Sequence, residues 1–204
     1  MSFPGPTPAT TAFSARVFIM SSPATEAASA AASDILATWR FCAMALAEPD
    51  DESLDLLQEQ PCQPLWLAAA LRELSALPLD AWQGEHTRLF TFPALCPPFA
   101  SAYLEEGTLN GHRAAALERF YGELGLLPTG LPADYLGTIC ECAAFLREQG
   151  EPEVLQGFCQ DTLGDWLDRF LGDLTAQSEL LFYRGLAQEL AGLVYACLTP
   201  ELQT

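Results

Sequence analysis

Apolar residues recur at three- and four-residue steps along most of the chain, which predicts helices rather than strands. A first helix is predicted from about Pro23 until Pro49 and Asp50 end it. Its core-facing stripe consists of Ile35, Leu36, Trp39, Cys42, Ala43 and Leu46. Shorter helices are predicted over residues 53–59, 65–77 and 81–92, with prolines at several of their boundaries.

The second half of the chain continues the helical pattern. Helices are predicted around residues 117–124, from 132 to 150, from 152 to 159 and from 178 to about 199. Asp161 is predicted to cap a further, strongly amphipathic segment. That segment buries Leu163, Trp166, Leu167, Phe170, Leu171 and Leu174. Since no segment alternates with a period of two, the predicted fold class is all-α, a single compact bundle of roughly eight to ten short helices.

The two ends and one turn set the expected domain organisation. Residues 1–22 are rich in Ser, Thr, Ala and Pro and are predicted to be disordered. Their apolar run is short and interrupted by Arg16, unlike a secretory signal, and Met20 is an alternative start of translation. The helical domain is expected over residues 23–204, with a hinge at residues 107–111.

The net charge of the chain indicates which classes of partner it can bind. The chain has 27 Asp and Glu against 9 basic residues, all arginine, for a net charge of −18. Such a surface repels a polyanion, so we expect no nucleic-acid partner, whereas a basic peptide would be attracted. The alternative is that the acidic surface only maintains solubility. No window approaches the ~18 uninterrupted apolar residues of a transmembrane helix, so no integral membrane segment is expected.

Seven cysteines among apolar neighbours indicate a reducing cytoplasm, and no metal or resident cofactor is expected. The two histidines, His86 and His112, lie on separate predicted elements, and common catalytic motifs are lacking. The chain is therefore predicted not to be an enzyme. Enzymatic alternatives would need Glu85 and Glu141 to pair, or Cys96 to have a lowered thiol pKa.

The stretch from Glu85 to Glu106 is the most unusual segment. Between Arg88 and Glu105 it carries no charge, and three prolines break it into helix, loop and helix. Loops are usually polar, so an apolar loop either packs back on the core or presents a groove to a partner.

Motifs in and after this stretch resemble those of a known family. The first comprises Glu85, Leu89 and Phe90, followed by Pro97-Pro98-Phe99-x-Ser101-x-Tyr103. The second runs from Leu131 to Leu136 and contains Asp134 and Tyr135. With the patterns of the last two helices, they resemble the TorD/DmsD/NarJ family of cytoplasmic chaperones that mature molybdenum-containing redox enzymes. The resemblance covers about residues 35–198.

The resemblance implies a protein that binds the twin-arginine leader of a molybdo- or tungsto-enzyme catalytic subunit and assists cofactor insertion before export. The residues that it implies for peptide binding are Glu85, His86, Leu89, Phe90, Pro97, Pro98, Phe99, Ser101, Tyr103, Asp134 and Tyr135. Apolar members would line a groove, and Asp134 with Glu85 or nearby acids would supply charge. Ser101 and Tyr103 would supply hydrogen bonds. Substituting Phe90 or Asp134 by Ala is expected to lower leader affinity while helicity is kept.

Structural roles are open for several of these residues. Leu89 and Phe90 fit a core position equally well, Tyr103 fits a brace for the loop, and Glu85 fits a tie between its helix and the loop. Tyr135 and His86 stand where the family commonly has His and an aromatic residue, respectively. The family resemblance implies a monomer or a domain-swapped dimer. The alternative function is a helical adaptor that binds a folded partner through the apolar loop.

Overall fold

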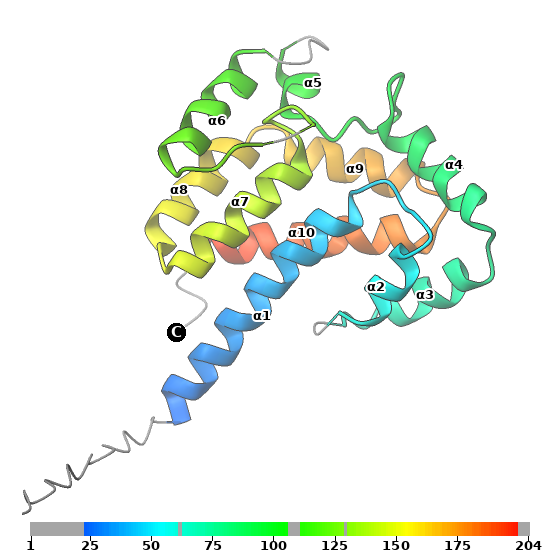
Figure 1. Ribbon diagram of the computed structural model, residues 1–204, viewed down its shortest axis with the longest axis horizontal. Coiled ribbons are helices and arrows are strands. Elements are labelled where there is room, and N and C mark those ends of the chain that lie inside the picture. Colours follow the sequence, from blue (N-terminus) through cyan, green and yellow to red (C-terminus); the bar gives the residue numbers. More distant parts are fainter. Residues whose placement is uncertain (1–22, 61–62, 106–110, 129, 200–204) are drawn as a thin grey trace, which may run out of the picture.

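The computed structural model describes residues 23–60, 63–105, 111–128 and 130–199. Within these ranges the chain forms ten α-helices and no β-strand, which confirms the predicted all-α class (Figure 1). The helices are α1 (Pro23–Ala45), α2 (Ser53–Gln58), α3 (Leu67–Ser75), α4 (Leu79–Phe90), α5 (Ala100–Leu104), α6 (His112–Glu123), α7 (Leu136–Gln149), α8 (Pro152–Leu163), α9 (Leu167–Gln177) and α10 (Leu181–Leu198). The predictions for residues 1–22 lie outside the described residues, as does nearly all of the predicted hinge.

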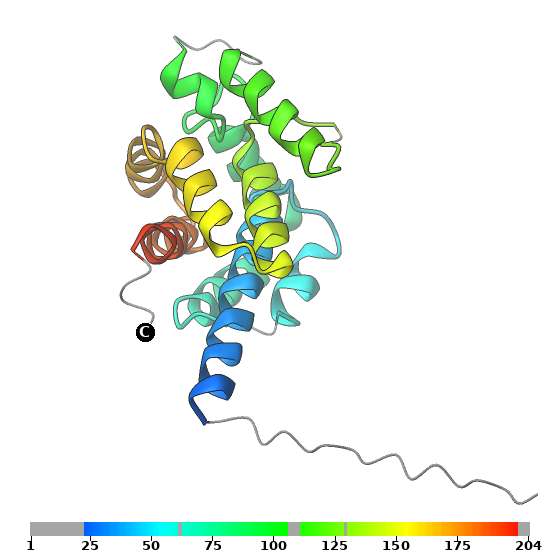
Figure 2. The same cartoon turned by 90° about the vertical axis from the view of Figure 1, so that its left-hand side faces the viewer.

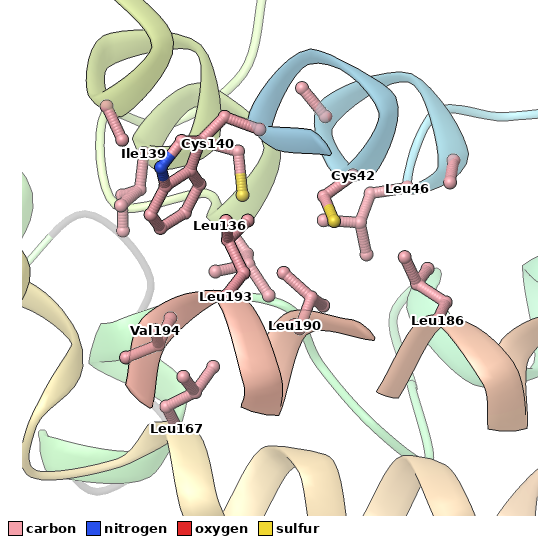
Figure 3. Packing of buried hydrophobic residues seen from close by; sticks show 14 of the residues in the cluster. Cys42, Leu46, Leu136, Ile139, Cys140, Leu167, Leu186, Leu190, Leu193 and Val194 are labelled. Carbon is pink, nitrogen blue, oxygen red and sulfur yellow. The ribbon is translucent and has the colours of Figure 1, made fainter. Parts of the chain in front are cut away.

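Helix α10 contacts four other helices, α1, α3, α8 and α9. Its buried side chains recur at three- and four-residue steps, from Phe182 to Val194. Leu186, Leu190 and Leu193 belong to one continuous apolar cluster with Cys42 of α1, Leu46 directly after α1, and Leu136 of α7 (Figure 3). Because this cluster draws on helices from both halves of the chain, the described residues share a single hydrophobic core.

The positions of two helix pairs, α1 with α7 and α5 with α6, determine where the candidate site lies. Helix α1 packs most extensively on α7, and the two lie side by side in both views (Figures 1 and 2). Helices α5 and α6 lie at the end of the bundle away from α2 and α3 (Figure 2). The carboxyl end of α1, the amino end of α7 and the loop that leads into α5 come together, because Tyr135 bonds to the Leu46 carbonyl and Leu136 bonds to the Pro98 carbonyl.

Close packing of α10 depends on one glycine. A Cβ atom added at Gly185 would lie 2.1 Å from the Trp66 ring. That ring donates from Nε1 to Glu189 Oε2 at 3.0 Å and packs edge-on against Phe41. The absent side chain thus lets Trp66 join the segment before α3 to α10.

Several predicted boundaries were wrong. Asp161 lies inside α8, which runs without a breaker as far as Leu163, and Trp166 occupies the N-cap position of α9. Helix α7 begins at Leu136 instead of Pro132, because residues 134–136 bond to another loop. The last helix begins at Leu181, since Ser178 has an extended backbone and donates its hydroxyl to the Leu174 carbonyl.

Among the described residues, no helix is both long and apolar enough to cross a membrane. Nor do three or more His, Cys, Asp or Glu side chains gather there in a way that could hold a metal ion.

Candidate functional site

The two sequence motifs lie against each other as one joint between residues 98–100 and 134–136. The Leu136 N–H donates to the Pro98 carbonyl at 2.8 Å, and the Ala100 N–H donates to the Asp134 carbonyl at 3.2 Å. Between them, Phe99 and Tyr135 form an isolated antiparallel bridge, with ring centroids 5.5 Å apart. These bonds fix the Pro-Pro loop to the start of α7.

The Asp134 carboxylate completes this joint from inside. Its side chain has 0% exposure, and its Oδ2 accepts the Ser101 N–H at 2.8 Å. This bond satisfies a backbone donor in the first turn of α5 that the helix itself cannot pair. Asp134 Oδ1 and the Ser101 hydroxyl have no hydrogen-bond partner within the described ranges. Asp134 therefore positions the loop and is closed off from direct contact with a large partner.

Tyr135 and His86 converge on the end of α1. The Tyr135 hydroxyl donates to the Leu46 carbonyl at 2.7 Å, and His86 Nε2 lies 3.1 Å from the same oxygen. Because a carbonyl oxygen only accepts, the contact assigns the proton of a neutral His86 ring to Nε2. The His86 ring also meets Phe90 edge to face, with centroids 5.1 Å apart. Helices α1, α4 and α7 are thus held together at one carbonyl.

The stability of the protein is expected to fall as pH drops below the ordinary His range, because His86 is buried. Burial lowers the pKa of His86, opposed in part by its hydrogen bond to Leu46 and the charge of Glu48. The other nearby groups are the Tyr135 hydroxyl, the Tyr183 ring and Glu141 across the groove described below. The unfolded chain binds the proton more readily below about pH 6.5, so stability falls there by at most about 1.4 kcal/mol per pH unit.

Urea unfolding of the protein and its His86→Gln variant between pH 7.5 and 5 measures this effect. Gln carries no titrating group, so the stability difference between the two proteins should change with pH in the stated direction. A difference that stays constant over this range would contradict the effect ascribed to His86.

A groove of about 520 Å³ lies where these elements meet. Five of the predicted residues line it: His86, Phe90, Pro98, Phe99 and Tyr135. The loop before α7 adds Leu127 and Leu131, which are 85% and 51% exposed. Gly137 also lines the groove, and a Cβ atom there would lie 2.4 Å from the Tyr135 ring. The walls are thus largely apolar and aromatic.

Two exposed carboxylates, Glu48 and Glu141, line the same groove. Glu141 also borders two adjoining hollows, one beside Phe145 and Leu126 and one beside Arg40. Neither carboxylate forms an ion pair within the part of the chain that the structure describes. A cationic group entering the groove would therefore meet carboxylates that the fold has not already neutralised.

Glu48 was not predicted from the sequence, and Glu141 was named only as the carboxylate that would pair with Glu85 in an enzyme. The signal for Glu141 was its place among buried neighbours on α7, where a charged residue must face outward. Glu48 follows the end of α1 directly before Pro49, and nothing in its local pattern marks it as functional.

Glu85 lies outside the groove and holds helices together. It is 7% exposed, accepts Arg88 Nη2 at 2.6 Å, and accepts the Glu179 N–H at 2.7 Å. These contacts join α4 to the segment between α9 and α10. They leave Glu85 paired, and they give no acid-base pair with Glu141.

Leu89, Pro97 and Tyr103 do not line the groove. Leu89 has 0% exposure in the core, and Pro97 precedes the joint without lining the groove. Tyr103 stacks near Trp166 with ring centroids 5.6 Å apart, and its hydroxyl donates to Asp173 Oδ2 at 3.3 Å. Arg169 lies over the Tyr103 ring, 5.3 Å from its centroid. Tyr103 thus braces α5 against α9.

The enzymatic alternative based on Cys96 requires a thiol with a lowered pKa, and Cys96 does not provide one. This side chain is fully buried, and burial raises the pKa of its thiol to about 11. At neutral pH it remains protonated and is a weak nucleophile.

Comparison with known proteins identifies the family to which the chain belongs. Residues 46–172 match the family model described as nitrate reductase delta subunit, which covers more than half of the chain. The protein belongs to this family, the TorD/DmsD/NarJ group of redox-enzyme maturation chaperones.

Individual relatives agree with this membership. The chain is 32% identical over 94 residues to "Chaperone protein YcdY" of Escherichia coli (strain K12), over 45% of this chain and 48% of that protein. The match thus spans about half the length of that relative. The fold is similar to that of an Archaeoglobus fulgidus protein described as a redox enzyme maturation protein, with a TM-score of 0.55 and 24% identity. That likeness covers 76% of this chain and 93% of the other.

Proposed function

We propose that this protein is a non-enzymatic cytoplasmic chaperone that binds the twin-arginine leader of a molybdo- or tungsto-enzyme catalytic subunit. It holds the precursor while cofactor is inserted and the enzyme is assembled, before export. The observation that carries the proposal is the groove, in which apolar and aromatic walls stand beside the unpaired carboxylates of Glu48 and Glu141. Family membership supports a redox enzyme as the partner.

The chemistry of the groove complements that of a leader peptide. Consecutive arginines bring two guanidinium groups, each able to bind a carboxylate through two parallel hydrogen bonds. The moderately apolar segment that follows them would lie on Phe90, Pro98 and Phe99, with Leu127 and Leu131 at the rim. A volume of about 520 Å³ is in the ordinary range of ligand sites and admits a few side chains of the peptide.

Several of the predicted residues, both in the groove and behind its lining, act by positioning. The hydrogen bond from Ser101 to Asp134 holds the Pro-Pro loop at the start of α7, and this places Phe99 against Tyr135. His86 and Tyr135 hold the end of α1, which leads directly to Glu48. A rigid wall lowers the ordering cost of binding a flexible peptide.

Replacing Glu48 and Glu141 by Gln tests the role of charge in the groove. Each substitution removes one carboxylate from an exposed position, so the fold should be kept. We expect each to weaken binding of a twin-arginine leader roughly tenfold, about 1.4 kcal/mol, and to reduce its salt dependence. Calorimetric titration with a synthetic leader peptide measures both effects.

Glu153→Gln is the matched control, because Glu153 is an exposed carboxylate on α8 that lines a different cavity. It changes the net charge equally and should leave affinity within about twofold. Equal affinity losses in all three variants would assign the effect to net charge, and no loss in any of them would exclude the groove as the arginine site.

A further inference from the structure

Two cysteines far apart in the sequence meet between α8 and α10. Cys197 Sγ lies 3.1 Å from Cys159 Sγ and 3.9 Å from the Leu155 carbonyl oxygen. Cys159 has 0% exposure, whereas Cys197 is partly exposed. The pair therefore joins a partly exposed cysteine to a fully buried one.

Cys197 lines a cavity of about 370 Å³ that involves α1, α7, α8 and α10. Arg147, Glu153 and Gln156 lie on the same cavity wall. The pKa of the Cys197 thiol is lowered because the Cys159 thiol hydrogen-bonds to it, with a further contribution from the Arg147 charge. The same hydrogen bond, and then burial, raise the pKa of Cys159. The Cys197 thiol therefore ionises more readily than the Cys159 thiol, and it is also the more exposed of the two.

We propose that Cys159 and Cys197 are a redox modification site, which a peroxide converts to a reversible disulfide that joins α8 to α10. The Cys197 thiolate attacks the peroxide oxygen, which gives a sulfenic acid and releases hydroxide. The Cys159 sulfur then attacks the Cys197 sulfur, so the S–S bond forms and the hydroxyl leaves as water with the Cys159 proton. The two thiols lose two electrons, and hydrogen peroxide is reduced to two waters.

Disulfide formation requires little movement of the two sulfurs. The sulfurs must approach from 3.1 Å to the disulfide length of about 2.05 Å. Cys197 is the next-to-last residue of α10, so its backbone can adjust without disturbing the helix centre. The bond would close a loop that contains all of α9, so the oxidised protein should unfold roughly 5–10 °C higher.

Other cysteines of the described core differ in reactivity. Cys96 and Cys142 are buried, and burial raises the pKa of their thiols to about 11 and about 12. Cys159 and Cys197, by contrast, have their sulfurs 3.1 Å apart. Reaction with peroxide is therefore expected to select one pair.

The experiment treats the purified full chain with a small excess of hydrogen peroxide, followed by thiol titration, intact-mass measurement and peptide mapping. We expect seven free thiols to fall to five, a mass loss of two hydrogens, and one crosslinked peptide containing Cys159 and Cys197. Dithiothreitol should restore all seven thiols. Cys197→Ser should block the change, while the matched variant Cys142→Ser should form the same crosslink.

Peptide mapping of the peroxide-treated protein with its natural sequence tests the proposal without relying on any variant. Seven thiols remaining after treatment, or a crosslink between other cysteines, would overturn it. Formation of sulfinic acid on Cys197 with no crosslink would also overturn it, because Cys159 would then have failed to resolve the sulfenic acid. The outcome is independent of peptide binding at the groove, which lies elsewhere on the protein.

Discussion

Replacing Phe90 by Ala is expected to lower the free energy of unfolding by about 3–5 kcal/mol. Phe90 is only 5% exposed, although it lines the groove. Its ring meets Tyr183 edge to face at 5.2 Å and lies 6.5 Å from the Phe170 ring. Removing it opens a cavity between α4, α9 and α10 that these rigid rings cannot fill. Urea unfolding followed by circular dichroism measures the loss.

Tyr195→Ala is the control for Phe90→Ala, because Tyr195 is an aromatic residue of α10 that is 61% exposed. The free energy of unfolding of this variant should differ from that of the unsubstituted protein by less than about 0.5–1 kcal/mol. If Phe90→Ala were no more destabilising than Tyr195→Ala, the Phe90 ring would not be part of the core. A loss of this size leaves many proteins folded at 25 °C, so the helicity of Phe90→Ala is expected to survive. Any drop in its leader affinity would combine two effects, the loosened packing of the groove and the lost contact with the peptide.

Replacing Asp134 by Ala is expected to cost about 2–3 kcal/mol of stability, because it leaves the Ser101 N–H buried without its partner. The carboxylate is fully buried and accepts that N–H at 2.8 Å, so water cannot replace it freely. The loss should also loosen the Pro-Pro loop and raise hydrogen exchange at Ser101 and Leu136. Exchange measured by mass spectrometry, together with urea unfolding, detects both effects.

Asp134→Asn separates geometry from charge in this joint. The Asn side-chain oxygen can still accept the Ser101 N–H, so most of the stability and the loop protection should return. If Ala and Asn were equally destabilising, the negative charge rather than the acceptor position would be what the joint requires. If neither changed stability, the joint would not support the loop.

The helices could be predicted from sequence because their apolar residues repeat at helical spacing. The stripe from Ile35 to Leu46 correctly predicted α1, and the last helix was also predicted, although its start was placed three residues too early. Boundaries failed where a tertiary contact decided them: α7 starts at Leu136 because Asp134 and Leu136 bond to the Pro-Pro loop. A local pattern cannot contain a hydrogen bond to a segment more than thirty residues away.

The site was predicted in part, for a related reason. The sequence marked both halves of the joint, but it did not show that Asp134 faces inward or that Glu85 is already paired with Arg88. Which carboxylates remain unpaired depends on how α1, α4 and α7 pack. That packing brings Glu48 and Glu141 to the groove and takes Glu85 away from it.

A calorimetric titration of the full chain with a twin-arginine leader peptide and its Lys-Lys counterpart, at low and moderate salt, tests the proposed function most directly. Binding of the arginine peptide at about micromolar strength, near −8 kcal/mol, is expected. It should weaken with salt and with lysine, because lysine cannot form the paired hydrogen bonds of a guanidinium. Absence of binding to leaders of several molybdo- and tungsto-enzymes, or equal binding of both peptides, would contradict the proposal and favour an adaptor that uses the apolar loop for a folded partner.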